Sequence, residues 1–199
     1  MVININSKIA IVGDNRAADS VLLEEIRKCF SAAGRSDVEF YNFAKKGNTA
    51  NIMAEEIEDA LAVNPDMIFI MVGYTDINMA GEESEKLRGF ASAIIKVLDI
   101  CKEKGITPIL ATCPALAESG MESLAEYAEK STKYFDVIRN LSTQNKVGLV
   151  EANEEFYLGE LEALTEGKSL ISDGEITTEG NQILGKIIAE ELLSSNFRI

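Results

Sequence analysis

Four short polar segments contain the side chains of this sequence that could do chemistry. The first is Gly13-Asp14-Asn15, where an apolar run from Lys8 to Val12 stops at a small residue, a carboxylate and an amide. The others span residues 42–49, 73–76 and 173–180. A β-branched apolar run of this kind predicts a buried strand, and the residues after it would form the turn into a helix. Because ligands bind at such turns in open α/β sheets, we expect the four segments to converge on one site.

In their order and separation, these segments resemble the sequence blocks of the SGNH (GDSL-like) hydrolase family. The first block of that family is an apolar strand ending in Gly-Asp-Ser, whose serine is the nucleophile, and here Asn15 occupies the serine position. The second block supplies a glycine whose backbone N–H helps to form the oxyanion hole, and it corresponds to Gly47. The third block is Gly-x-Asn-Asp, with Thr75 in place of the asparagine. The last is Asp-x-x-His, in which Asp173 is retained and Ile176 occupies the histidine position.

The resemblance implies the fold of that family, whereas the replaced residues argue against its chemistry. A hydroxyl group is a poor nucleophile until an adjacent base, usually histidine, takes its proton, and this chain contains no histidine. We therefore predict a pseudoenzyme rather than an enzyme. It would bind a glycan or an acylated sugar in the old pocket, or act as a structural or assembly module, for example within a virion or another complex. The alternative is an active SGNH-type esterase with unconventional residues, in which Glu175 replaces the base, although an ordinary carboxylate is a weak base for a hydroxyl.

Each candidate residue also has a purely structural interpretation. Asp14 could orient a ligand or cap the following helix, and Asn15 could bind a ligand or adopt a left-handed turn conformation. Gly47 could direct its N–H into the pocket or only provide a positive φ angle. Asp173 would orient the histidine in the family, and without one it more simply closes its loop. Arg16 could attract an anion to the pocket or lie on a solvated face.

Composition limits the partners and cofactors. The net charge of −14 argues against a nucleic-acid or anionic-membrane surface, because both need clustered Lys and Arg. No apolar run approaches the length of a membrane-spanning helix and the start does not resemble a signal peptide, so we expect a cytoplasmic protein. A histidine-based metal site is impossible and the three cysteines are scattered, so we predict neither a metal nor a cofactor. A small-molecule or glycan ligand and a protein assembly partner are the remaining candidates.

Strands and helices alternate along the chain, which predicts right-handed βαβ units around a parallel sheet. The expected strands lie near residues 8–12, 38–41, 67–72, 107–112 and 147–150. Helices are expected from residue 17 to about 34 and over 49–64, 87–104, 122–144 and 178–193. The segment 153–172 allows a short helix plus a loop, because Gly159 and Gly167 interrupt its helical pattern. We expect one domain over residues 1–199, a three-layer α/β/α sandwich with a five-stranded parallel sheet in the order 2-1-3-4-5.

Overall fold

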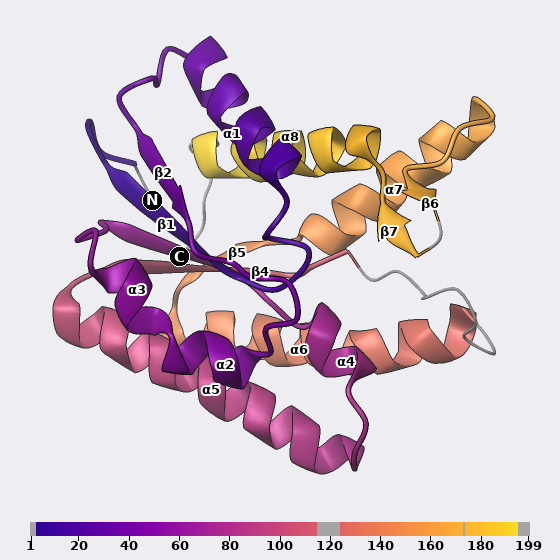
Figure 1. The fold of residues 1–199 in the computed structure, drawn as a ribbon, viewed down its shortest axis with the longest axis horizontal. Helices are drawn as coiled ribbons and strands as arrows, with labels where there is room; N and C mark the ends of the chain where they lie inside the picture. The colour runs from indigo at the N-terminus through magenta and orange to yellow at the C-terminus, as the bar shows by residue number, and fades with distance from the viewer. Residues whose placement is uncertain (1–2, 115–123, 173, 195–199) are drawn as a thin grey trace.

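The computed structural model describes residues 3–114, 124–172 and 174–194 and contains a parallel sheet with helices on both faces (Figure 1). Its strands lie in the order β2-β1-β3-β4-β5, and each neighbouring pair is parallel. The predicted three-layer architecture and strand order are therefore confirmed. The sheet strands are β1 (Lys8–Gly13), β2 (Glu39–Asn42), β3 (Met67–Met71), β4 (Thr107–Ala111) and β5 (Gly148–Val150).

The helices form two layers because the strands are apolar on both faces. Successive side chains of a strand point to opposite faces, so Ile9 and Ile11 belong to one hydrophobic core, and Ala10 and Val12 belong to the other. The first core is covered by α1 (Ser20–Ala32), α7 (Ala152–Thr165) and α8 (Thr178–Leu193), and the second by α2 (Ala50–Glu55), α3 (Ile57–Leu61), α5 (Glu83–Lys104) and α6 (Leu124–Asn145). None of the described helices is long and apolar enough to cross a membrane.

The end of β1 requires a glycine. Gly13 has a φ angle of +156°, and a Cβ atom at this position would lie 1.9 Å from the carbonyl oxygen of Met71 on the neighbouring strand. The close approach brings the turn after β1 beside the turn after β3. A short helix that the sequence did not predict, α4 (Tyr74–Asn78), begins in that second turn.

Two other regions differ from the sequence-based expectation. The helix expected over 49–64 is divided into α2 and α3 at Glu56. Most of the segment 153–172 belongs to the fourteen-residue helix α7, which begins at Ala152 and continues through Gly159. A two-stranded antiparallel hairpin follows, formed by β6 (Ile171–Ser172) and β7 (Glu175–Ile176). The buried Glu160 carboxylate on α7 accepts hydrogen bonds from the Leu170 N–H at 2.6 Å and the Ser169 hydroxyl at 2.7 Å, so it fixes the approach to the hairpin.

Candidate functional site

Asp14 lies beneath the turn after β1 and joins this turn to the one after β3. Its side chain is fully buried. One carboxylate oxygen accepts hydrogen bonds from the N–H groups of Gly73 at 2.9 Å and Thr75 at 3.3 Å, and the other accepts from the Arg16 N–H at 3.1 Å. Burial raises the pKa of Asp14 against the lowering effect of these three donors. Asp14 therefore holds the backbone of both turns in place.

Asn15, in the turn after β1, contacts Gly47, in the loop after β2, although 32 positions separate them in the sequence. The Gly47 N–H donates to the Asn15 side-chain oxygen across 2.6 Å. Gly47 has a φ angle of +82°, a conformation that side chains rarely adopt, and this orients its N–H toward β1. Among the described residues, the Asn15 amide nitrogen and backbone N–H make no hydrogen bond, so a polar ligand would find both donors available.

Thr75 and Asp76 lie in the turn after β3, with different exposure. Thr75 is partly exposed, and its backbone N–H is bound to Asp14. Asp76 is buried and accepts the Ala50 N–H with both oxygens, at 3.2 and 3.0 Å, at the start of α2. Burial and, to a lesser degree, the neighbouring Asp14 raise the pKa of Asp76 to about 6. Asp76 thus anchors the loop that carries Gly47.

Arg16 links the β1 turn to the β6–β7 hairpin. Its side chain is only 2% exposed, and its guanidinium lies 3.7 Å from the centre of the Tyr74 ring. Nη1 contacts the Glu175 carboxylate at 3.1 Å, Nη2 donates to the Gly174 carbonyl at 3.1 Å, and the buried Nε has no partner among the described residues. The sequence suggested a cation at the rim of a pocket or on a solvated face. The structure shows instead a buried tether for the hairpin.

This tether joins the described part of the fourth segment to the turn after β1. Ile176 pairs with Ile171 in the hairpin and packs, half-buried, against the first hydrophobic core. Asp173 lies outside the described residues. The neighbouring Glu175 carboxylate is 65% exposed and makes its described contact through one oxygen to Arg16. Hydrogen bonds of Asp14 and Asn15 join the first three segments, and Arg16 joins the described part of the fourth to the first.

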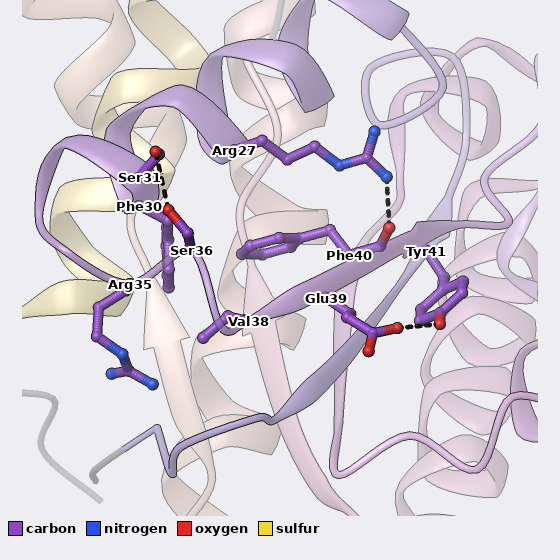
Figure 2. A pocket seen from close by; sticks show the side chains of 9 residues that line it. All are labelled: Arg27, Phe30, Ser31, Arg35, Ser36, Val38, Glu39, Phe40 and Tyr41. Atoms are coloured by element: carbon purple, nitrogen blue, oxygen red, sulfur yellow. Dashed lines mark hydrogen bonds between the residues drawn. The ribbon is translucent and has the colours of Figure 1, made fainter.

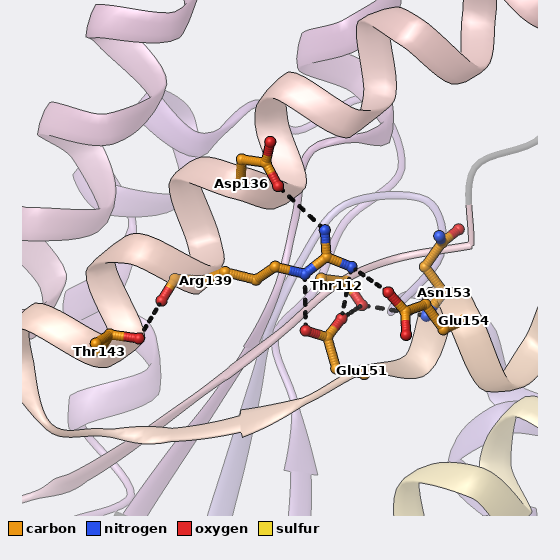
Figure 3. A network of polar contacts seen from close by, with 7 residues as sticks. All are labelled: Thr112, Asp136, Arg139, Thr143, Glu151, Asn153 and Glu154. Atoms are coloured by element: carbon orange, nitrogen blue, oxygen red, sulfur yellow. Dashed lines mark hydrogen bonds and ion pairs between the residues drawn. The ribbon is translucent and has the colours of Figure 1, made fainter.

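A second polar network closes the same edge of the sheet at β4 and β5 (Figure 3). Glu151 follows β5, and both of its carboxylate oxygens accept hydrogen bonds from Arg139 on α6, at 2.8 and 3.0 Å. The Thr112 hydroxyl, after β4, donates to Glu151 at 3.3 Å and accepts the Asn153 N–H at 3.1 Å. Arg139 also contacts Glu154 at 2.8 Å. These groups satisfy one another and fix α6 and α7 to the strand ends.

Cys113 follows β4 at the same edge of the sheet, and its environment disfavours a role as a nucleophile. The thiol is fully buried, and burial strongly raises its pKa, with a smaller contribution from Asp14. In the described part of the chain, accessible functional groups at or joined to the β1 turn include the Asn15 amide, the partly exposed Thr75 and the Glu175 carboxylate. Among the described residues, no cluster of His, Cys, Asp and Glu has the arrangement of a metal site.

Two hollows of the described surface, each of about 440 Å³, lie away from Asn15 and Gly47. One lies between the end of α1 and the start of β2, away from the carboxyl ends of the strands (Figure 2). Its two arginines are engaged, since Arg27 donates to the Phe40 carbonyl at 2.6 Å and Arg35 binds Asp37 at 3.0 Å. Asn15 and Ile176 do not line this hollow.

Comparisons with known proteins identify the fold through solved structures alone. No protein-family model matches the sequence, and no curated protein matches it. An acetylxylan esterase from Geobacillus stearothermophilus, solved as a catalytic mutant, matches with a TM-score of 0.79 and 18% identity over 96% of both chains. A lipase/acylhydrolase from Enterococcus faecalis matches with a TM-score of 0.74 and 19% identity, over 94% of this chain and 95% of that one. The acetyl xylan esterase AlAXEase matches with a TM-score of 0.74 and 19% identity, over 91% of this chain and 97% of that one. The structural neighbours are thus esterases of the SGNH type, which share the fold of this chain at low sequence identity.

This comparison contradicts the prediction that the chain is not an enzyme. The solved structures that match this chain over nearly their whole length include two acetyl xylan esterases and a lipase/acylhydrolase. The prediction rested on the replacement of a serine and a histidine. Those replacements limit which groups could carry out hydrolysis, but the chain still has the fold of these esterases.

Proposed function

We propose that the protein is an SGNH-type ester hydrolase that lacks the Ser–His pair and removes small acyl groups, such as acetyl, from carbohydrates by direct attack of water. The observation that carries this proposal is the contact between the Gly47 N–H and the Asn15 side-chain oxygen at 2.6 Å. A backbone donor of the kind used in oxyanion holes is held at the strand end where esterases of this fold carry their nucleophile. The Asn15 amide oxygen occupies the place that an ester carbonyl oxygen would take.

In the proposed reaction, the ester carbonyl oxygen displaces the Asn15 oxygen and accepts the Gly47 N–H. The Asn15 amide nitrogen and backbone N–H are available as further donors to the negative charge that develops on this oxygen. A water oxygen attacks the carbonyl carbon and its proton passes to the Glu175 carboxylate. When the bond from the carbonyl carbon to the sugar oxygen breaks, Glu175 returns the proton to that oxygen. The products are a carboxylic acid and a free sugar hydroxyl.

We assign the base to Glu175, an exposed carboxylate in the hairpin that Arg16 joins to the turn after β1. Asp14 and Asp76 are buried, and backbone N–H groups occupy both oxygens of each side chain. Glu175 is 65% exposed, and Arg16 holds one of its oxygens while the other faces no described donor. Because a carboxylate is a weaker base than an imidazole, we expect turnover far slower than that of a Ser–His esterase.

The carbohydrate part of the proposal rests on the structural neighbours, two of which are acetylxylan esterases by description. Binding of the acylated sugar precedes hydrolysis at the same site. Asn15 supports such binding because it is partly exposed and no described residue accepts from its amide nitrogen.

The experiment measures acetate release from p-nitrophenyl acetate and from acetylated xylo-oligosaccharides by wild-type protein, Glu175→Gln and Glu179→Gln. Glu179 is a matched control, since it is 55% exposed in the first turn of α8, just after the hairpin. Loss of a general base should lower kcat by about 100-fold or more in Glu175→Gln, and Glu179→Gln should resemble wild type. No burst of product should precede the steady state, because no acyl-enzyme forms.

Two results would refute the proposal. Turnover no faster than in a protein-free blank, with acetylated sugar still bound, would identify a binding site without hydrolysis. Equal turnover in wild type and Glu175→Gln would exclude Glu175 as the base.

A further inference from the structure

A groove with an apolar floor runs between α7 and α8, outside the candidate esterase site. Its volume is about 440 Å³. The floor contains Leu158 and Gly159 of α7, the buried Leu170, and Ile183 and Ile187 of α8. The Leu158 side chain is accessible, since the residue is 59% exposed.

The rim of this groove is strongly acidic. Five glutamates and two lysines line it: Glu155, Glu162, Glu166, Glu179, Glu190, Lys168 and Lys186. Both lysines are already paired, Lys168 with Glu166 at 3.2 Å and Lys186 with Glu190 at 3.7 Å. By contrast, Glu155 and Glu162 form no ion pair within the described parts of the chain. Two exposed carboxylates of α7 therefore have no ion-pair partner among the described residues.

The unpaired carboxylates have a spacing that another helix can match. Glu155, Leu158 and Glu162 lie at positions i, i+3 and i+7 of α7, so they share one side of the helix and the two carboxylates are about 10 Å apart along its axis. Tyr157, Leu161 and Leu164 are also exposed, but they are not among the residues that line the groove. Charged residues at the rim and an accessible apolar centre form the pattern of a helix-binding groove.

We propose that the α7–α8 groove binds a basic amphipathic helix of a partner protein. Apolar side chains of that helix would cover Leu158 and the groove floor, and Lys or Arg residues two turns apart would face Glu155 and Glu162. Charge identifies this occupant. A second copy of the chain, with a net charge of −14, would bring its own acidic rim against this one, and nucleic acids and anionic membranes carry the wrong sign.

The test uses a designed peptide of about 18 residues that forms an amphipathic helix, with leucines on one face and lysines two turns apart on its flanks. Fluorescence anisotropy of the labelled peptide gives its Kd for the full chain at about 50 mM and 500 mM salt. We expect saturable binding at one site that weakens with salt, and no binding of the same peptide with glutamate in place of lysine. Leu158→Ala should weaken binding about fivefold or more at either salt concentration.

Charge reversal separates the groove from the overall charge. Glu155→Lys with Glu162→Lys should weaken binding by about 100-fold at low salt. The matched control is Asp99→Lys with Glu103→Lys, which makes the same change in net charge on exposed positions of α5. It should change Kd less than about threefold. Equal losses in both double variants would show non-specific attraction and overturn the proposal, as would tight binding of the glutamate peptide or self-association of the chain through Leu158.

Discussion

Replacement of Arg16 by methionine should destabilise the protein far more than neutralisation of its ion-pair partner, Glu175. Methionine keeps a linear apolar side chain in the buried position and removes the guanidinium. The guanidinium makes three described contacts: the Gly174 carbonyl at 3.1 Å, the Glu175 carboxylate at 3.1 Å and the face of the Tyr74 ring at 3.7 Å. Glu175→Gln, in contrast, changes a side chain that is 65% exposed.

The contacts set the expected magnitudes. A hydrogen bond from a charged donor to a buried carbonyl is worth about 1.5 to 3 kcal/mol, and a desolvated cation–π contact contributes up to about 2 kcal/mol. Removal of a buried charge recovers part of its desolvation cost, so we expect Arg16→Met to lower the free energy of unfolding by about 2 to 3 kcal/mol. In Glu175→Gln the amide oxygen can still accept the Arg16 N–H, and the lost charge was 65% exposed to water, so this variant should cost less than about 1 kcal/mol.

Urea unfolding followed by far-UV circular dichroism measures both values near neutral pH. Arg88→Met is the matched control, because Arg88 is exposed on α5 and its replacement should change stability by about 0.5 kcal/mol or less. Equal losses in Arg16→Met and Glu175→Gln would mean that the ion pair, rather than the buried contacts to Gly174 and Tyr74, holds the hairpin. A loss below about 1 kcal/mol in Arg16→Met would refute the tether altogether.

Three further predictions follow from the same turns. Gly13→Ala should cost more than about 4 kcal/mol or prevent folding in a urea or thermal melt, because its Cβ would lie 1.9 Å from the Met71 carbonyl oxygen, and a loss below about 1 kcal/mol would contradict this geometry. The pKa of Asp76 is raised from 3.8 to about 6 in the folded state, which therefore binds the proton more tightly than the unfolded state does. The stability that this proton contributes is lost as the pH rises from about 4 through 6. Relative to Asp76→Asn, wild type should lose about 3 kcal/mol over this range, and a pH-independent difference in urea unfolding would exclude the shift. The double variant Asn15→Ser with Ile176→His should show an acyl-enzyme burst with p-nitrophenyl acetate that neither single variant shows, because nucleophile and base act as a unit. A burst in either single variant would disprove this pairing.

Much of the architecture could be predicted from the sequence because it depends on local patterns. The apolar run from Lys8 to Val12 ends at Gly13, and β1 ends there too. Helix α8 begins after Thr177, whose hydroxyl accepts the Gly180 N–H at 3.0 Å. Alternating strands and helices, together with right-handed crossovers, leave few possible arrangements, and the strand order was predicted correctly. The absence of histidine is likewise a property of the sequence, and it limits the chemistry in any fold.

The environment of each site residue could not be predicted, because it depends on contacts between distant segments. Arginine is usually a surface residue, yet Arg16 is buried by Tyr74 and by the hairpin that contains Glu175, 159 positions away in the sequence. The Gly47 N–H meets Asn15 in a loop that Asp76, from the turn after another strand, holds through the Ala50 N–H. Local sequence patterns record which side chains are apolar and where a helix can begin or end. They do not record which backbone group a side chain will contact in a distant segment. In this protein those contacts determine which donors and carboxylates remain available for chemistry.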